Sequence, residues 1–102
     1  MTNHNKNFYE TMHKYNNKLN MYSKALTKVH GGTHPEVFDV RHLFERIDTE
    51  LKRSNQKDLN LDIEFESLRE VTNNYTIPED ACEAFKGVYQ MLSEADQAYY
   101  NS

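Results

Sequence analysis

Apolar side chains recur at alternating spacings of four and three through the N-terminal third of the chain. This pattern constrains the fold more than any other feature. Such spacing places the side chains on one face of a helix, because an α-helix has about 3.6 residues per turn. An apolar face of that length must be buried against other helices. It consists of Phe8, Met12, Tyr15, Leu19, Tyr22, Leu26 and Val29.

Glycine, threonine and proline mark the boundary between this helix and the next one. Gly31-Gly32 is expected to end the first helix, because glycine adopts left-handed conformations without steric cost. Thr33 is the expected N-cap of a second helix, with Glu36 completing a capping box and Pro35 in the first turn. The apolar face of the second helix consists of Val37, Val40, Phe44, Ile47 and Leu51.

Two further helices are expected after a break at residues 54–58. Ile63 also leaves open a weak strand-like alternation in the third segment. After a turn, Thr76 and Glu79 predict a second capping box that opens the fourth helix. The third helix is shorter and would use Leu61, Phe65, Leu68 and Val71, with the turn at residues 72–75. The fourth would bury Ala81, Phe85, Val88, Leu92, Ala95 and Tyr99.

Four amphipathic segments with short connections predict an all-α fold, namely an antiparallel four-helix bundle with a shortened third helix. A chain of 102 residues is the size of one domain, so a single domain is expected over residues 1–102. With 37% hydrophobic and 27% charged residues, the composition is typical of a polar globular protein rather than a disordered one.

Charge and hydropathy exclude several partner classes. A net charge of -4 argues against nucleic-acid binding. The sequence contains no apolar stretch of membrane-spanning length, and its polar N-terminus lacks the apolar segment of a signal peptide. We therefore expect no membrane partner and a cytoplasmic location. The single cysteine, Cys82, fits a reducing compartment because it has no intramolecular disulfide partner.

Two longer motifs resemble a known family. They are Val29-His30-Gly31-Gly32-Thr33-His34-Pro35-Glu36-Val37 and Asn73-Asn74-Tyr75-Thr76-Ile77-Pro78-Glu79-Asp80-Ala81-Cys82. Together they are similar to the hemerythrin-like domain of the iron–sulfur cluster repair di-iron proteins, over most of the chain with an internal gap. The resemblance implies a four-helix bundle that holds two irons through histidines and carboxylates on facing helices. It also implies a role in repairing iron–sulfur centres after oxidative or nitrosative damage.

The same resemblance indicates which metal ligands are present. His30 matches a family ligand at the end of the first helix, whereas Tyr9 stands at the earlier histidine position, with His13 one turn later. In the second helix serine replaces the family histidine and Asp58 supplies the carboxylate. The next histidine segment is missing, and the chain ends at Ser102, where another is expected. His30 and Asp58 are therefore the residual metal positions, too few for two irons.

Each candidate residue also has a structural interpretation. The charge of a histidine at a helix C-terminus interacts favourably with the helix dipole, which suits His30 equally well. Tyr9 is better explained as a packed aromatic residue than as a phenolate ligand. Cys82 is expected to be a small buried residue, and His34 and His42 are expected to be surface or capping residues. The sequence has no Ser/His/Asp order, Gly-rich phosphate loop or Cys-x-x-Cys pair, so no enzyme class is indicated.

Three hypotheses follow. The first is a degenerate hemerythrin-like bundle without a complete di-iron site or other cofactor, which is not an enzyme and binds a protein partner or forms a homodimer. The second is a non-haem iron protein of iron–sulfur cluster repair or stress response, whose ligands (His30, Asp58, His13 or Tyr9) are completed across a dimer. The third is a truncated remnant with no independent task.

Overall fold

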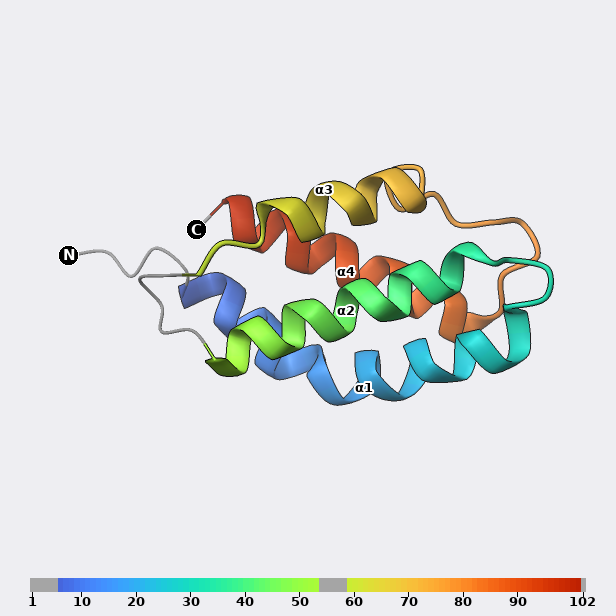
Figure 1. The fold of residues 1–102 in the computed structure, drawn as a ribbon, viewed down its shortest axis with the longest axis horizontal. Helices are drawn as coiled ribbons and strands as arrows, with labels where there is room; N and C mark the ends of the chain where they lie inside the picture. Colours follow the sequence, from blue (N-terminus) through green and yellow to red (C-terminus); the bar gives the residue numbers. More distant parts are fainter. Residues whose placement is uncertain (1–5, 54–58, 102) are drawn as a thin grey trace.

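The computed structural model describes residues 6–53 and 59–101, which form four helices around one elongated core (Figure 1). Among these residues there is no strand, so the alternation around Ile63 does not produce one. The prediction of a compact, all-α, four-helix protein is confirmed. The helices are α1 (Lys6–His30), α2 (Glu36–Arg53), α3 (Asp62–Val71) and α4 (Glu83–Tyr100).

The helices lie lengthwise beside one another in a molecule of 46 × 22 × 22 Å (Figure 1). Helix α1 packs against α2 and α4, and α2 packs against α3. Helix α3 reaches α4 through large side chains, with the rings of Phe65 and Tyr99 5.2 Å apart. The ring of Phe8 lies 5.3 Å from that of Tyr99, so the beginning of α1 and the end of α4 share one end of the molecule.

The predicted apolar faces supply most of the core, as the buried side chains of Leu19, Phe44, Phe65 and Leu92 illustrate. Val29 is an exception, because 72% of it is exposed. In the last turn of α1 the inward position is taken by His30, whose ring packs against Phe85. Consecutive residues on a helix point about 100° apart, so Val29 points away from the core.

Neither predicted capping box forms. The α2 helix begins at Glu36, and the Thr33 hydroxyl donates to the backbone oxygen of His30 instead of accepting from the helix. The α4 helix begins at Glu83, and the Thr76 hydroxyl donates to the backbone oxygen of Asn73 at 2.6 Å. Both threonines therefore stabilise the turn before them, because their hydroxyls bond to backbone acceptors on their N-terminal side.

The first helix ends directly before the two glycines, as predicted, but the predicted left-handed backbone is not the reason. Neither Gly31 nor Gly32 has a positive φ. A Cβ on Gly31 would instead lie 2.5 Å from the backbone oxygen of Thr27 and 2.6 Å from the Phe38 ring. Gly31 is thus required by close packing. The left-handed backbone occurs in the predicted turn after α3, where φ is 54° at Asn73, 58° at Asn74 and 63° at Tyr75.

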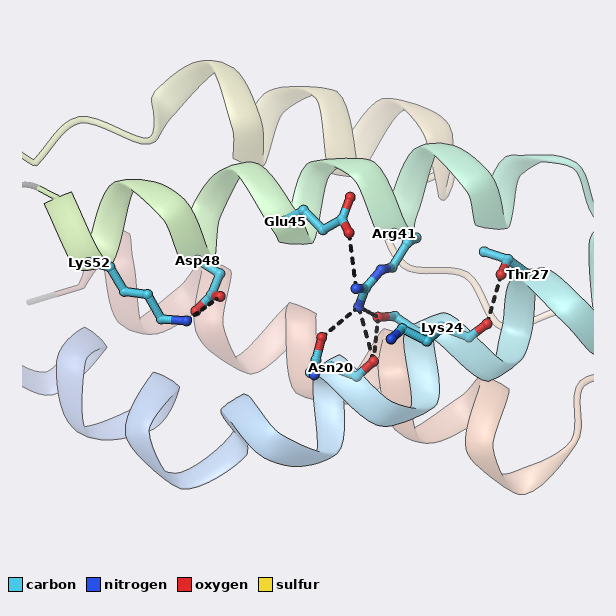
Figure 2. A network of polar contacts seen from close by, with 8 residues as sticks. Asn20, Lys24, Thr27, Arg41, Glu45, Asp48 and Lys52 are labelled. Atoms are coloured by element: carbon cyan, nitrogen blue, oxygen red, sulfur yellow. Dashed lines mark hydrogen bonds and ion pairs between the residues drawn. The ribbon is translucent and has the colours of Figure 1, made fainter.

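A line of polar side chains joins α1 to α2, here called the α1–α2 polar seam (Figure 2). Arg41 Nη1 donates to the backbone and side-chain oxygens of Asn20, at 3.0 and 2.9 Å, and to Ser23 Oγ at 3.0 Å. Further along, Asn16 Nδ2 donates to Asp48 at 2.8 Å. These bonds can form only in one lengthwise alignment of the two helices, so they help to specify it.

Candidate functional site

The end of the molecule at the turn between α1 and α2 brings two of the five histidines together, and we call it the histidine end. His30 is the last residue of α1, His34 lies in the turn, and Cys82 directly precedes α4. Both histidine rings pack edge-on against the buried Phe85, with centroid distances of 5.2 Å for His30 and 5.3 Å for His34. Asp80 joins this group from the segment that leads into α4.

Both ring nitrogens of His34 face carboxylates. Nε2 lies 3.0 Å from either oxygen of Asp80, and Nδ1 lies 3.0 Å from Glu36 Oε2. Each nitrogen satisfies its carboxylate only by donating, so the ring is favoured in its doubly protonated, cationic form. The hydrogen bonds to Asp80 and then to Glu36 raise the pKa of His34, and the bond from His34 lowers the pKa of Asp80.

His30 faces Cys82. Its Nε2 atom lies 3.3 Å from the Cys82 sulfur, within hydrogen-bonding distance for a thiol. Cys82 is exposed, so the prediction that it is buried is wrong. The reason is positional: Cys82 occupies the N-cap of α4, before the helix turns its apolar face inward.

Among the residues that the sequence links to a metal, those that the structure describes do not meet in one place. His30 is half-buried at the end of α1, and Asp58 lies outside the residues that the structure describes. Tyr9 and His13 lie toward the other end of the 25-residue helix α1, and Tyr9 is roughly 30 Å from His30 along the axis. Ligands of a two-metal centre surround ions only about 3.5–4 Å apart. Tyr9 and His13 therefore cannot share such a centre with His30 within one chain.

Two carboxylates are buried in the described part of the bundle, and each is engaged by an arginine. Glu64 lies 3.1 Å from Arg46. Asp96 accepts bonds of 2.9 and 3.1 Å from Arg69 and one of 2.7 Å from the Tyr75 hydroxyl. Burial and the bond to Asp96 raise the pKa of Tyr75, so its phenol stays protonated and donates. Neither carboxylate is left open to a metal ion.

The residues described do not fit a di-iron centre. Such a centre needs several histidines and carboxylates that point inward from facing helices. Within residues 6–53 and 59–101, no group of three or more His, Cys, Asp or Glu side chains is placed to hold a metal ion. The buried positions hold hydrocarbon side chains such as Leu19, Ile47, Val88 and Leu92.

In comparisons with protein-family models, curated proteins and solved structures, nothing matches the chain. None of the helices in the part of the chain described is both long enough and apolar enough to cross a membrane.

Sequence reasoning missed the two polar clusters that tie distant segments together. It treated His34 as a surface or capping residue and Asp80 as part of a helix start, whereas the two side chains bond to each other. It also did not single out Asp96. A signal for Asp96 existed, since this charged residue stands beside Ala95 and one helical turn after Leu92 on the apolar face of α4. A charge in that position requires a partner, and Arg69 supplies it.

Proposed function

We propose that this chain is a degenerate hemerythrin-like bundle, with antiparallel helices, that binds a protein partner or a second copy of itself. The filled interior is the observation that carries the proposal. The core of the described residues is packed hydrocarbon, and the buried carboxylates Glu64 and Asp96 are each paired with an arginine. The proposed role requires neither a bound cofactor nor a catalytic residue.

Large apolar side chains on the outside of the bundle support partner binding. The exposed fractions are 72% for Val29, 69% for Ile63, 61% for Met21 and 53% for Phe38. These side chains lie on α1, α2 and α3, and burying any of them against a partner releases free energy. The net charge of -4 and the lack of a membrane-spanning helix among the described residues favour a protein partner in the cytoplasm over nucleic acid or membrane.

Metal content and self-association, measured on the same untagged protein, test the proposal. We expect far less than one iron per chain, a cooperative thermal transition, and association that increases with concentration in sedimentation equilibrium. Val29→Ser should weaken association. Lys28→Ser, at the neighbouring exposed residue, is the control and should leave association unchanged. Two irons per chain would contradict the proposal. A protein that stays monomeric at every concentration would exclude the homodimer and leave binding to a different protein.

The histidine end supports a second candidate function, a non-haem iron protein of iron–sulfur cluster repair or stress response. The observation that favours it is a pair of atoms of the kind that bind metals, His30 Nε2 and the Cys82 sulfur, which lie 3.3 Å apart. Cys82 is exposed, so a second copy can approach this end of the molecule. In this alternative the ligand set is completed across a dimer. Replacing His30 with alanine should then abolish metal uptake, and unchanged uptake would eliminate this candidate.

A further inference from the structure

Basic residues are concentrated on α1. This helix holds five of the twelve lysine and arginine residues of the chain but only one of its sixteen acidic residues, Glu10. Among the described residues, the lysines and arginines that form ion pairs lie on α2, α3 and α4. The lysines of α1 are therefore paired with none of the described carboxylates, although the chain as a whole carries a net charge of -4.

Two of these lysines share one side of α1 with apolar side chains. Val29 is 72% exposed, Ala25 is exposed, and Tyr22 packs against the core from the side. Spacings of three and four place such residues on one side of a helix. We call this side the α1 stripe, and it consists of Lys14, Lys18, Tyr22, Ala25 and Val29. Lys28 is not part of it, because consecutive helical residues such as Lys28 and Val29 point about 100° apart.

The outer face of α3 has the opposite charge. Ile63 is 69% exposed, and the exposed Glu66 and Glu70 follow it on the same side at spacings of three and four. We call these three residues the α3 face. The ion pairs of α3 use Glu64 and Arg69 instead. The α3 face is thus apolar toward its beginning and acidic toward its end.

The two surfaces match in charge, in apolar character and in spacing. Ala25 lies seven residues from Lys18 along α1. Ile63 lies seven residues from Glu70 along α3, which is the same distance of roughly 10 Å. When the two helices are antiparallel, the apolar ends of both surfaces meet and so do their charged ends. Apolar burial then favours association, and the opposite charges determine which surfaces meet.

We propose that the α1 stripe of one copy docks on the α3 face of a second copy. This inference rests on the proposed function and names the surfaces through which the chain binds itself. Figure 1 shows α1 and α3 along opposite edges of the bundle, with α2 and α4 between them. One pair of copies therefore cannot form both contacts at once, and each pair leaves one stripe and one face free. Such a heterologous contact adds further copies, so the assembly grows beyond a dimer.

Sedimentation of the untagged full chain over a range of concentrations tests the proposal. We expect species larger than a dimer, and association that weakens as salt rises from about 50 to about 500 mM, because salt screens the charges. Lys14→Glu combined with Lys18→Glu should weaken association about tenfold or more, because like charges then face each other. Glu66→Lys combined with Glu70→Lys should have the same effect for the same reason.

An equimolar mixture of these two charge-reversed proteins is the most specific measurement. Each protein alone carries the same sign of charge on its stripe and its face. In the mixture, the acidic stripe of one protein meets the basic face of the other, and the two original surfaces also meet. The mixture should therefore regain the association of the original protein to within about threefold. This recovery also requires both variants to be folded.

The matched control combines Lys6→Glu with Lys24→Glu, which makes the same change of charge on α1 but outside the stripe. It should change association less than about threefold, because screening limits the reach of exposed charges. Equal weakening in this control and in the stripe variant would overturn the proposal, as would a mixture that does not associate. If both charge-reversed proteins associate like the original, this docking is wrong, whereas self-association through another surface, and with it the proposed function, stands.

Two further outcomes would also overturn the docking between copies. One is an original protein that stays monomeric at about 1 mM, which leaves the proposed function with a different protein partner. The other is a monomer that sediments with anionic phospholipid vesicles and loses this binding when Lys14 and Lys18 are reversed. That result would assign the α1 stripe to a lipid surface instead.

Discussion

Nε2 of His34 lies 3.0 Å from the carboxylate of Asp80, although 46 positions separate the two residues in the sequence. The opposite ring nitrogen contacts Glu36 at 3.0 Å. One imidazole thus joins the turn after α1, the first residue of α2 and the segment that leads into α4. The ring also packs against the buried Phe85, which holds it in place for both contacts. His34 therefore links these three segments at the histidine end.

We predict that this bridge makes stability depend on pH. The folded pKa of His34 is raised above 6.5, so its contribution is complete below that value and is lost as pH rises through the folded pKa. The pKa of Asp80 is lowered below 3.8, so its contribution is present above that value and is lost as pH falls through the folded pKa. The bridge therefore contributes fully between these two ordinary values, and thermal midpoints measured from acid to alkaline pH should show it.

The control for the bridge is Asp80→Asn, which removes the charge and keeps the size of the side chain. In this variant the fall in thermal midpoint above pH 6.5 should be smaller, because His34 then keeps Glu36 as its only carboxylate partner. Titration of His34 by NMR should give a lower pKa in the variant. Identical pH profiles for the two proteins would show that the bridge does not contribute in solution.

A second prediction concerns the buried carboxylate of α4. Replacing Arg69 with alanine leaves Asp96, which is 6% exposed, with the hydrogen bond from the Tyr75 hydroxyl. Removing one partner of a buried ion pair is strongly destabilising, and the partial exposure of Arg69 reduces the effect to about 2–3 kcal/mol. Urea unfolding should detect this loss of unfolding free energy.

The matched control for Arg69 is Arg46→Ala. Arg46 also pairs with a buried carboxylate, Glu64, but half of its side chain is exposed to water. We expect Arg46→Ala to lower the free energy of unfolding by about 1 kcal/mol or less, because solvent screens an exposed charge. Equal losses in the two variants would mean that burial of the arginine does not determine the strength of these pairs.

A third prediction concerns the α1–α2 polar seam. Arg41 directs one nitrogen at Asn20 and Ser23 and the other at Glu45, 3.0 Å away. Lysine keeps the charge but lacks the planar fork, so Arg41→Lys should lower the free energy of unfolding by about 1–2 kcal/mol. Arg53→Lys is the control, since the Arg53 side chain is 73% exposed, and it should be neutral in the same urea unfolding assay.

The helices and most of the core were predictable because they depend on local spacing. A stripe such as Phe8, Met12, Leu19 and Leu26 has one helical interpretation, and all four residues are buried. The turn after α3 was predictable for the same reason, since asparagine tolerates the left-handed backbone that Asn73 adopts. Whether the helices share the hemerythrin arrangement stays a prediction, as does a metal role for Asp58.

The polar links were not predictable because their partners are distant in sequence. Thr76 and Glu79 had the spacing of a capping box, but the helix begins only at Glu83. Nothing in the local sequence shows that Asp80 bonds to His34.

The last prediction uses the adjacent glycines of the turn after α1. A Cβ on Gly31 would lie 2.6 Å from the Phe38 ring and 2.5 Å from the backbone oxygen of Thr27. The ring can move aside, but moving the backbone oxygen would distort the last turn of α1. Gly31→Ala should therefore lower the free energy of unfolding by about 1–3 kcal/mol. At about 4–8 °C per kcal/mol, calorimetry should show a clear fall in thermal midpoint.

Gly32→Ala is the matched control for Gly31→Ala, because a Cβ there meets no atom within 4 Å and φ is not positive. Alanine also restricts the unfolded chain more than glycine does, so Gly32→Ala should be neutral or stabilising by up to about 1 kcal/mol. If both glycines served left-handed backbone, as the sequence suggests, both substitutions would be destabilising. A strong effect at Gly31 alone would show that close packing against α2, rather than backbone conformation, requires a glycine there.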